Sequence, residues 1–154
     1  MKMNKNISIK NRLLKSYLLN ENQFYFSEEK FEKEISNWFE NALEIKFQKK
    51  GTKLFFEIAF YEIADKKEIN LFSFQLKDNT YSGIGYNVLS INDFCTKNNL
   101  ENKWNRLNNF NGITFEEKLN NLIIEFEQFV RSTDLIKVFR GEVWYDQYWI
   151  NYRD

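Results

Sequence analysis

The feature that most constrains the fold is a change in the period of the apolar residues. From Leu43 onward, apolar side chains alternate with polar ones, whereas before that position they recur every three or four residues. Alternation places apolar groups on one face of a β-strand, because successive side chains point to opposite faces. Strands joined by short polar turns such as Lys50-Gly51 must run antiparallel, since a parallel pair requires a long crossover. The sequence therefore predicts an antiparallel meander in the middle of the chain.

Two helices are predicted before the strands, over residues 4–20 and 27–43, where apolar side chains recur at helical spacing. Ser27 is a good N-cap, and Glu28 and Glu29 follow it in the first turn, where the helix dipole favours acidic groups. The apolar face of the first helix is expected to consist of Ile9, Leu13, Leu14, Tyr17 and Leu18. The strands themselves are expected over residues 43–48, 54–61, 69–76 and 81–88.

Further helices are predicted after the strands. Thr114 and Glu117 have the spacing of a capping box at the start of a long apolar-periodic segment. Shorter helices are expected after Ser90, around Leu100, Trp104 and Leu107, and over Leu135 to Phe139. The predicted fold class is α+β, with N-terminal helices, a four-stranded antiparallel meander, and C-terminal helices packed on one face of the sheet. Without an internal repeat or linker, residues 1–154 are expected to form one such domain.

The absence of histidine excludes several classes of catalytic and metal site. The chain has no histidine, and its single cysteine is Cys95. It therefore lacks the Ser-His-Asp and Cys-His arrangements that activate nucleophiles, as well as histidine-based zinc sites. An intramolecular disulfide needs a second cysteine. We expect no cofactor and no metal, and we expect Cys95 to be a small buried apolar group in a reducing compartment.

Charge and hydropathy point to a protein that binds neither membranes nor nucleic acid. Lys and Arg together number 22, and so do Asp and Glu, so the net charge is zero. A zero net charge provides no overall field to attract phosphates or an anionic membrane. Apolar runs such as Leu122-Ile123-Ile124 are far shorter than the ~20 residues of a membrane span. We expect a soluble cytoplasmic protein, with nucleic acid disfavoured as a partner.

One set of residues has the order of a nuclease motif. Gln75-Leu76-Lys77 closes an apolar strand, Asp65 lies upstream of it, and Glu34 lies on the helix predicted before the strands. This pattern resembles the PD-(D/E)xK nuclease superfamily, although Gln75 stands where that family has a carboxylate. The resemblance implies a divalent-metal-dependent nuclease, in which the acidic positions hold Mg²⁺ and Lys77 stabilises charge or positions water.

The C-terminal tail is the predicted binding surface. Trp and Tyr anchor many protein interfaces, because they desolvate a large area and still offer a hydrogen bond. Polar neighbours such as Asp146 would form a rim around them. The tail is either helix or strand, and the alternative is that it simply closes the domain over its core. The proposed contact residues are Trp144, Tyr145, Asp146, Tyr148, Trp149 and Tyr152.

Two functional hypotheses follow from the sequence. The first is a non-catalytic protein-binding module, of the inhibitor or immunity type, whose partner is a toxin or another enzyme. It rests on the aromatic tail and on the missing catalytic and metal-binding residues. The second is the metal-dependent nuclease built on Glu34, Asp65, Gln75 and Lys77. Enzymatic activity is the less favoured of the two, and a homo-oligomer formed through the tail is compatible with the first.

Overall fold

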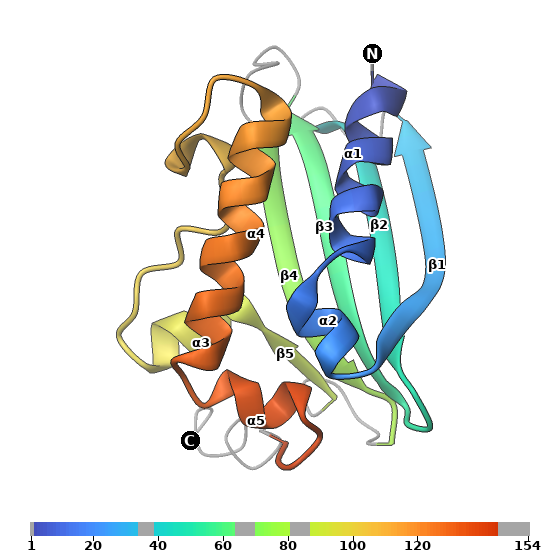
Figure 1. Cartoon of the computed structure of the whole chain (residues 1–154), viewed down its shortest axis with the longest axis vertical. Helices are drawn as coiled ribbons and strands as arrows, with labels where there is room; N and C mark the ends of the chain where they lie inside the picture. Colours follow the sequence, from blue (N-terminus) through green and yellow to red (C-terminus); the bar gives the residue numbers. More distant parts are fainter. Residues whose placement is uncertain (1, 34–38, 64–69, 81–86, 145–154) are drawn as a thin grey trace.

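The chain folds into an antiparallel sheet with helices on one face (Figure 1). The computed structural model describes residues 2–33, 39–63, 70–80 and 87–144. The five strands follow one another across the sheet in chain order, and each pairs antiparallel with the next. The α+β class and the antiparallel meander predicted from the sequence are confirmed, with five strands in place of four. The strands are β1 (Phe24–Lys33), β2 (Phe39–Lys49), β3 (Leu54–Ile63), β4 (Asn70–Asp78) and β5 (Val88–Ser90).

The described helices lie together on one side of the sheet, with α1 over β1 and β2 and with α4 over β4 (Figure 1). None of them is long and apolar enough to cross a membrane. A single turn of 3-10 helix, η1 (Leu107–Asn109), lies between the third and fourth helices. The helices are α1 (Lys2–Leu14), α2 (Tyr17–Glu21), α3 (Ile91–Lys97), α4 (Phe115–Arg131) and α5 (Leu135–Phe139).

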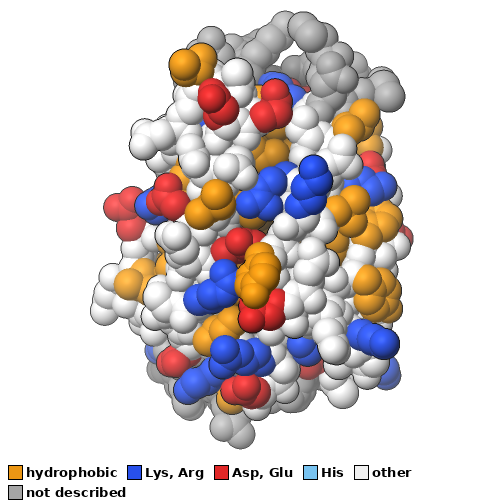
Figure 2. All heavy atoms as spheres, viewed as in Figure 1, with side chains coloured by type: hydrophobic (Ala, Val, Ile, Leu, Met, Phe, Trp, Pro, Cys, Tyr) orange, Lys and Arg blue, Asp and Glu red, His pale blue; other side chains and the backbone are white. Residues whose placement is uncertain are grey.

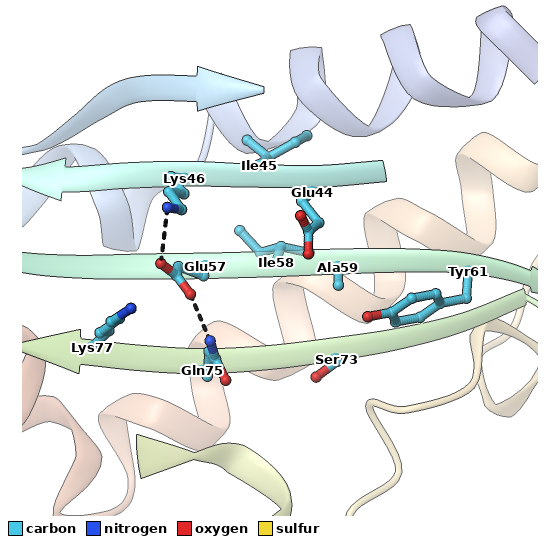
Figure 3. A pocket seen from close by; sticks show the side chains of 10 residues that line it. All are labelled: Glu44, Ile45, Lys46, Glu57, Ile58, Ala59, Tyr61, Ser73, Gln75 and Lys77. Atoms are coloured by element: carbon cyan, nitrogen blue, oxygen red, sulfur yellow. Dashed lines mark hydrogen bonds and ion pairs between the residues drawn. The ribbon is translucent and has the colours of Figure 1, made fainter. Parts of the chain in front are cut away.

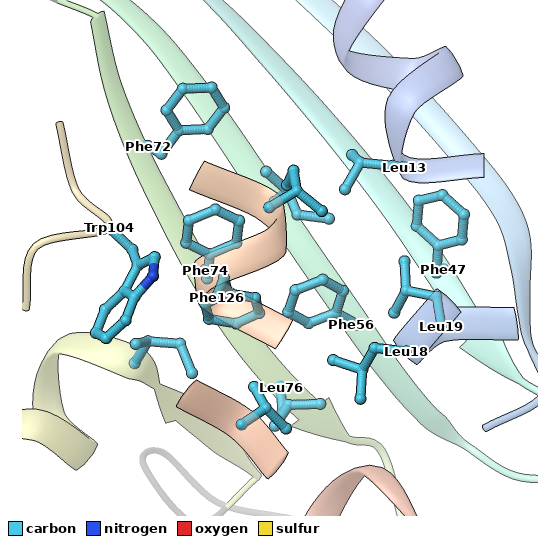
Figure 4. Close-up of a cluster of buried hydrophobic side chains, with 14 of the residues drawn as sticks. Leu13, Leu18, Leu19, Phe47, Phe56, Phe72, Phe74, Leu76, Trp104 and Phe126 are labelled. Atoms are coloured by element: carbon cyan, nitrogen blue, oxygen red, sulfur yellow. The ribbon is translucent and has the colours of Figure 1, made fainter. Parts of the chain in front are cut away.

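The core forms where the alternating apolar residues of the strands meet the helices. Inward-facing side chains of β2, β3 and β4, such as Ile45, Phe56 and Phe74, are buried. Phe126 of α4 stacks on Phe74 with ring centroids 4.7 Å apart, and on Phe56 at 5.9 Å (Figure 4). Phenylalanine rings packed in this way bury a large apolar area, which is the main favourable contribution to folding. An aromatic stack therefore joins α4 to the sheet, beside the other buried apolar residues of this helix.

Several predicted helix boundaries are confirmed at the level of individual hydrogen bonds. Thr114 and Glu117 form the reciprocal capping box that opens α4, and the Ser90 hydroxyl accepts from the Asp93 N–H at the start of α3. The helix predicted over Leu135 to Phe139 is also present. Cys95, on α3, is buried as expected, and burial raises the pKa of its thiol to about 11.

The helix predicted over residues 27–43 is wrong. Residues Phe24–Lys33 form strand β1, and β2 begins at Phe39, while residues 34–38 lie outside the described part of the chain. The register between β1 and β2 shifts between Phe26 and Glu28, which marks a β-bulge at Ser27. A bulge inserts one residue and so interrupts the alternation of side chains. The disrupted alternation, together with the Ser-Glu-Glu sequence, resulted in the incorrect helix prediction.

The first predicted helix is divided in two. α1 ends at Leu14, and Ser16 starts α2 by accepting a hydrogen bond from the Leu19 N–H. Because the chain turns at this point, Leu14 and Tyr17 are exposed, although the sequence placed them on the buried face. Ile9, Leu13 and Leu18 are buried as predicted.

The helix predicted around Leu100, Trp104 and Leu107 is also wrong, because this segment contains no α-helix and passes through a turn at Trp104 and Asn105 to the single turn of η1. It runs beside β4, where Leu71 and Arg106 form an antiparallel bridge and the Phe72 N–H donates to the Asn105 carbonyl at 2.9 Å. Trp104 and Leu107 point into the core from this segment. Of the strand predicted over residues 81–88, only Val88 lies in a described strand, β5, because residues 81–86 are outside the described part.

Candidate functional site

The face of the sheet opposite the helices carries the candidate site described below. Alternate residues of β2, β3 and β4 are buried against the helices, and the residues between them point the other way. No described helix lies on this second side (Figure 1). We call it the open face.

A polar row crosses the open face from strand to strand. Glu28 of β1 lies opposite Lys46 of β2, Lys46 lies opposite Glu57 of β3, and Glu57 lies opposite Gln75 of β4. The Lys46 ammonium lies 3.4 Å from the Glu28 carboxylate and 3.7 Å from the Glu57 carboxylate. The Gln75 amide donates to the other oxygen of Glu57 at 2.5 Å (Figure 3). The antiparallel register therefore places side chains of complementary polarity next to each other over four strands.

A shallow hollow of about 240 Å³ lies along this row (Figure 3). Tyr61 is half-buried at one end of it, where burial raises the pKa of its phenol, assisted by the carboxylates of Glu44 and Glu32. The Tyr61 hydroxyl is therefore a neutral group in this hollow near neutral pH. The hollow is lined by Glu44, Ile45, Lys46, Glu57, Ile58, Ala59, Tyr61, Ser73, Gln75 and Lys77.

Among the described residues of the open face, charges of both signs are interspersed, with no excess of basic groups. A surface that binds a phosphate backbone instead concentrates Lys and Arg in order to release counterions. This face is therefore suited to a partner that itself carries charges of both signs. The charged residues at outward-facing register positions are Glu28, Lys30, Glu32, Glu44, Lys46, Glu57 and Lys77.

The helical side of the molecule is also mixed in charge, with acidic and basic side chains interspersed (Figure 2). Two basic side chains of α1 are engaged within the fold. Lys10 pairs with Glu29 of β1 at 3.1 Å, and Arg12 donates to the Asn120 side chain of α4 at 2.9 Å. These contacts tie α1 to the sheet and to α4, so they support the fold.

Two of the four residues in the nuclease hypothesis lie together. Gln75 and Lys77 both line the hollow, on alternate positions of β4. Glu34 and Asp65 lie outside the described residues. The carboxylate beside Gln75 is Glu57, which already accepts the Gln75 amide and pairs with Lys46. Among the described residues, no group of three or more His, Cys, Asp or Glu side chains is arranged to hold a metal ion.

Of the aromatic tail, only the first residue is described. Trp144 is half-buried and packs against the core. This contact is what the alternative interpretation expects, in which the tail closes the domain. The other predicted contact residues, which lie in 145–154, are outside the described part of the chain: Tyr145, Asp146, Tyr148, Trp149 and Tyr152.

The sequence prediction missed Lys46, Glu57 and Tyr61, which form the centre and one end of the hollow. A signal for them was present, because all three occupy polar or outward positions in segments with clear alternation. The turn at Lys50-Gly51 fixes the register of β2 against β3 and would have aligned Lys46 with Glu57. Comparison of the chain with protein-family models, with curated proteins and with solved structures finds no match.

Proposed function

We propose that this protein is a non-catalytic protein-binding module, of the inhibitor or immunity type, and that the open face is its binding surface. The observation that carries the proposal is the row from Glu28 to Gln75, an ordered set of ion pairs and hydrogen bonds on a side of the sheet that no described helix covers. When a protein partner presents opposite charges to such a face, these charges orient the partner and speed its association.

Size favours a protein partner over a small molecule. Ligand pockets usually enclose about 300–1,000 Å³ and bury most of the ligand. The hollow on the open face is smaller, at about 240 Å³, and shallow. It is suited to receive one or two side chains of a larger surface. Around it, Tyr25 of β1 is 47% exposed and offers an aromatic contact at the margin.

An inhibitor or immunity role is consistent with a rigid surface. The groups of the row are held on regular strands, so they lose little conformational freedom when a partner binds. A protein that blocks an enzyme needs no catalytic group of its own. The partner-contact residues predicted from Trp144 to Tyr152 are a second part of this proposal. They are to be tested separately from the open face.

The test is site-specific photo-crosslinking in extract of the native host. A photoreactive amino acid replaces Ser73, which is exposed and lines the hollow. The matched control replaces Ile124, which is exposed on α4 on the opposite side of the sheet. We expect one protein to crosslink from position 73 and not from position 124. Equal capture at both positions, or capture only at position 124, would contradict an open-face interface.

The captured protein then provides a quantitative test. Lys77 lines the hollow, and Lys77→Glu reverses a charge at the surface of the sheet. We expect this substitution to weaken binding of the purified partner about tenfold, mainly through slower association. For the inhibitor role, the wild-type protein must also reduce the activity of a captured enzyme. Binding without any loss of enzyme activity would support a protein-binding module and contradict the inhibitor role.

A second candidate function is the metal-dependent nuclease, which is favoured by the position of Gln75 and Lys77 beside Glu57 in one hollow. It predicts nicking of plasmid DNA that depends on Mg²⁺ and is lost in Lys77→Ala. Isothermal titration with Mg²⁺ separates the two functions, because a binding module of the proposed type takes up no metal. The mixed charge of the open face favours the first function, since a nuclease must attract phosphates.

A further inference from the structure

The outer edge of β1 is a second surface that the proposed function does not use. β1 is the first strand of the sheet, and no described segment pairs with its other side. Every second residue of an edge strand directs its N–H and C=O away from the sheet, where they can pair with another strand. The strand spans Phe24–Lys33 and contains no proline, and beyond its bulge at Ser27 the pairing with β2 is regular.

The charges at this edge are self-complementary. The sequence Glu29-Lys30-Phe31-Glu32-Lys33 reverses its charge about Phe31. When two copies of such a strand run antiparallel about a two-fold axis at Phe31, Lys30 of each lies opposite Glu32 of the other. Centring the axis on Lys30 instead would place Lys30 opposite itself and Glu28 opposite Glu32. Directly opposed opposite charges stabilise an antiparallel pair, and like charges destabilise it.

The directions in which the β1 side chains point are compatible with the same register. The two-fold axis of an edge-to-edge pair is perpendicular to the sheet, so directly opposed residues must point to the same face. Lys30 and Glu32 satisfy this condition, because both lie on the open face. Phe31 lies on the helical face, opposite Leu43 in the sheet, and it is 38% exposed at the edge. Pairing would bring the two Phe31 rings together and bury apolar surface that is exposed in the single chain.

From these observations we propose that the protein forms a homodimer by antiparallel pairing of β1 with β1 of a second copy, in the register centred on Phe31. Within one chain, Lys30 and Glu32 already form an ion pair at 2.8 Å. In the dimer the four side chains form an alternating cluster of charges across the junction. The sheet then continues from one copy into the other, and the open faces of both copies lie on the same side.

The test is a charge-swap experiment read by sedimentation velocity over a series of concentrations. Lys30→Glu places acidic residues opposite each other at both symmetric positions, and Glu32→Lys does the same with basic ones. Each variant alone should self-associate about tenfold more weakly than the wild type. An equimolar mixture should form a heterodimer, because every opposed pair is then opposite in charge. The double variant Lys30→Glu/Glu32→Lys should dimerise like the wild type.

The mixture separates this interface from effects within one chain, since the intrachain ion pair is lost in both single variants and is not restored by mixing. Both positions are exposed, at 64% and 48% for the two side chains, so the fold should tolerate all three variants. Hydrogen exchange provides an independent measurement. Amides of β1 in the wild type should become more protected as concentration rises. A wild type that sediments as a monomer at every concentration overturns the proposal, and so do single variants that associate as strongly as the wild type.

Discussion

At the scale of single residues, the buried carboxylate of Glu127 is the clearest case of a polar group that the fold requires. It lies on α4 and accepts hydrogen bonds from the Ser16 hydroxyl at 2.5 Å and from the Leu18 N–H at 3.2 Å. Ser16 in turn caps α2. Buried polar groups are tolerated when they are hydrogen-bonded, and each of these groups depends on the others. Glu127 therefore joins α4 to the start of α2.

We expect Glu127→Gln to lower the free energy of unfolding by about 1–3 kcal/mol, because the amide is a weaker acceptor and its NH₂ group has no ready partner in this site. Urea unfolding followed by circular dichroism measures the change. The matched control is Glu125→Gln on the same helix, where the carboxylate pairs with Lys103 at 2.6 Å near the surface. Glu125→Gln should lower the free energy of unfolding by less than about 1 kcal/mol. Equal losses in the two variants would contradict a structural role for Glu127.

At the scale of elements, the secondary structure was predicted correctly where the residue pattern within one segment determines it. The alternation in β2, β3 and β4 and the capping box of α4 follow directly from side-chain geometry, and both were predicted. The bulge at Ser27 has a different cause, because it depends on the pairing of β1 with β2. The residues of β1 that point inward are Phe24, Phe26 and then Glu29, so their spacing changes from two residues to three. A local reading of the sequence cannot distinguish this change from the start of a helix.

The capping box gives a prediction about pH. The Thr114 and Ile113 N–H groups donate to the Glu117 carboxylate and lower its pKa from the ordinary value of 4.5. A carboxylate with a lowered pKa in the folded state stabilises the protein above its unfolded-state pKa, and this stability is lost as the pH falls through the folded-state value. Wild type should therefore be more stable than Glu117→Gln at neutral pH.

The difference in melting temperature between these two proteins should diminish as the pH is lowered below 4.5. Thermal unfolding at a series of pH values checks this. Glu116→Gln, a change in the same helical turn, should not reproduce the effect, because the two N–H groups donate to Glu117. A difference in melting temperature that stays constant down to acid pH would show that the hydrogen bonds to the charged carboxylate contribute nothing to stability.

At the scale of the whole molecule, the fold class could be predicted and the candidate site only in part. Gln75 and Lys77 were identified from a short motif, and they do lie in the hollow. Glu57 and Lys46 were not identified, because their importance arises only when β2 is aligned with β3 across the turn at Lys50-Gly51, and with β1 and β4 on either side. The uncovered side of the sheet is likewise a property of how all the helices pack.

The aromatic stack predicts how the molecule unfolds. Phe126 joins α4 to both β3 and β4 through its contacts with Phe56 and Phe74. We expect Phe126→Ala to lower the free energy of unfolding by about 3–5 kcal/mol, because it removes a buried ring and leaves a cavity. Phe126→Leu should lower it by less, because a smaller part of the side chain is lost. Denaturant titrations followed by near- and far-ultraviolet circular dichroism measure the loss of stability and the cooperativity of unfolding.

The control for this series is Ile124→Ala, at a position 39% exposed on the same helix. Its effect should be within about 1 kcal/mol. If Phe126→Ala were no more harmful than Ile124→Ala, the stack would not be what holds α4 on the sheet. If helical signal disappeared well before strand signal, the sheet would be stable without its cover.

The order of elements along the chain has a consequence for biosynthesis. In the described part of the chain the strands lie between Phe24 and Ser90, whereas α4 begins at Phe115. Domains fold during translation as their residues emerge, at about 5–20 residues per second. The nascent meander therefore leaves the ribosome several seconds before the helix that shields its phenylalanines. During that interval we expect the phenylalanines that α4 later covers to be exposed and accessible to chaperones.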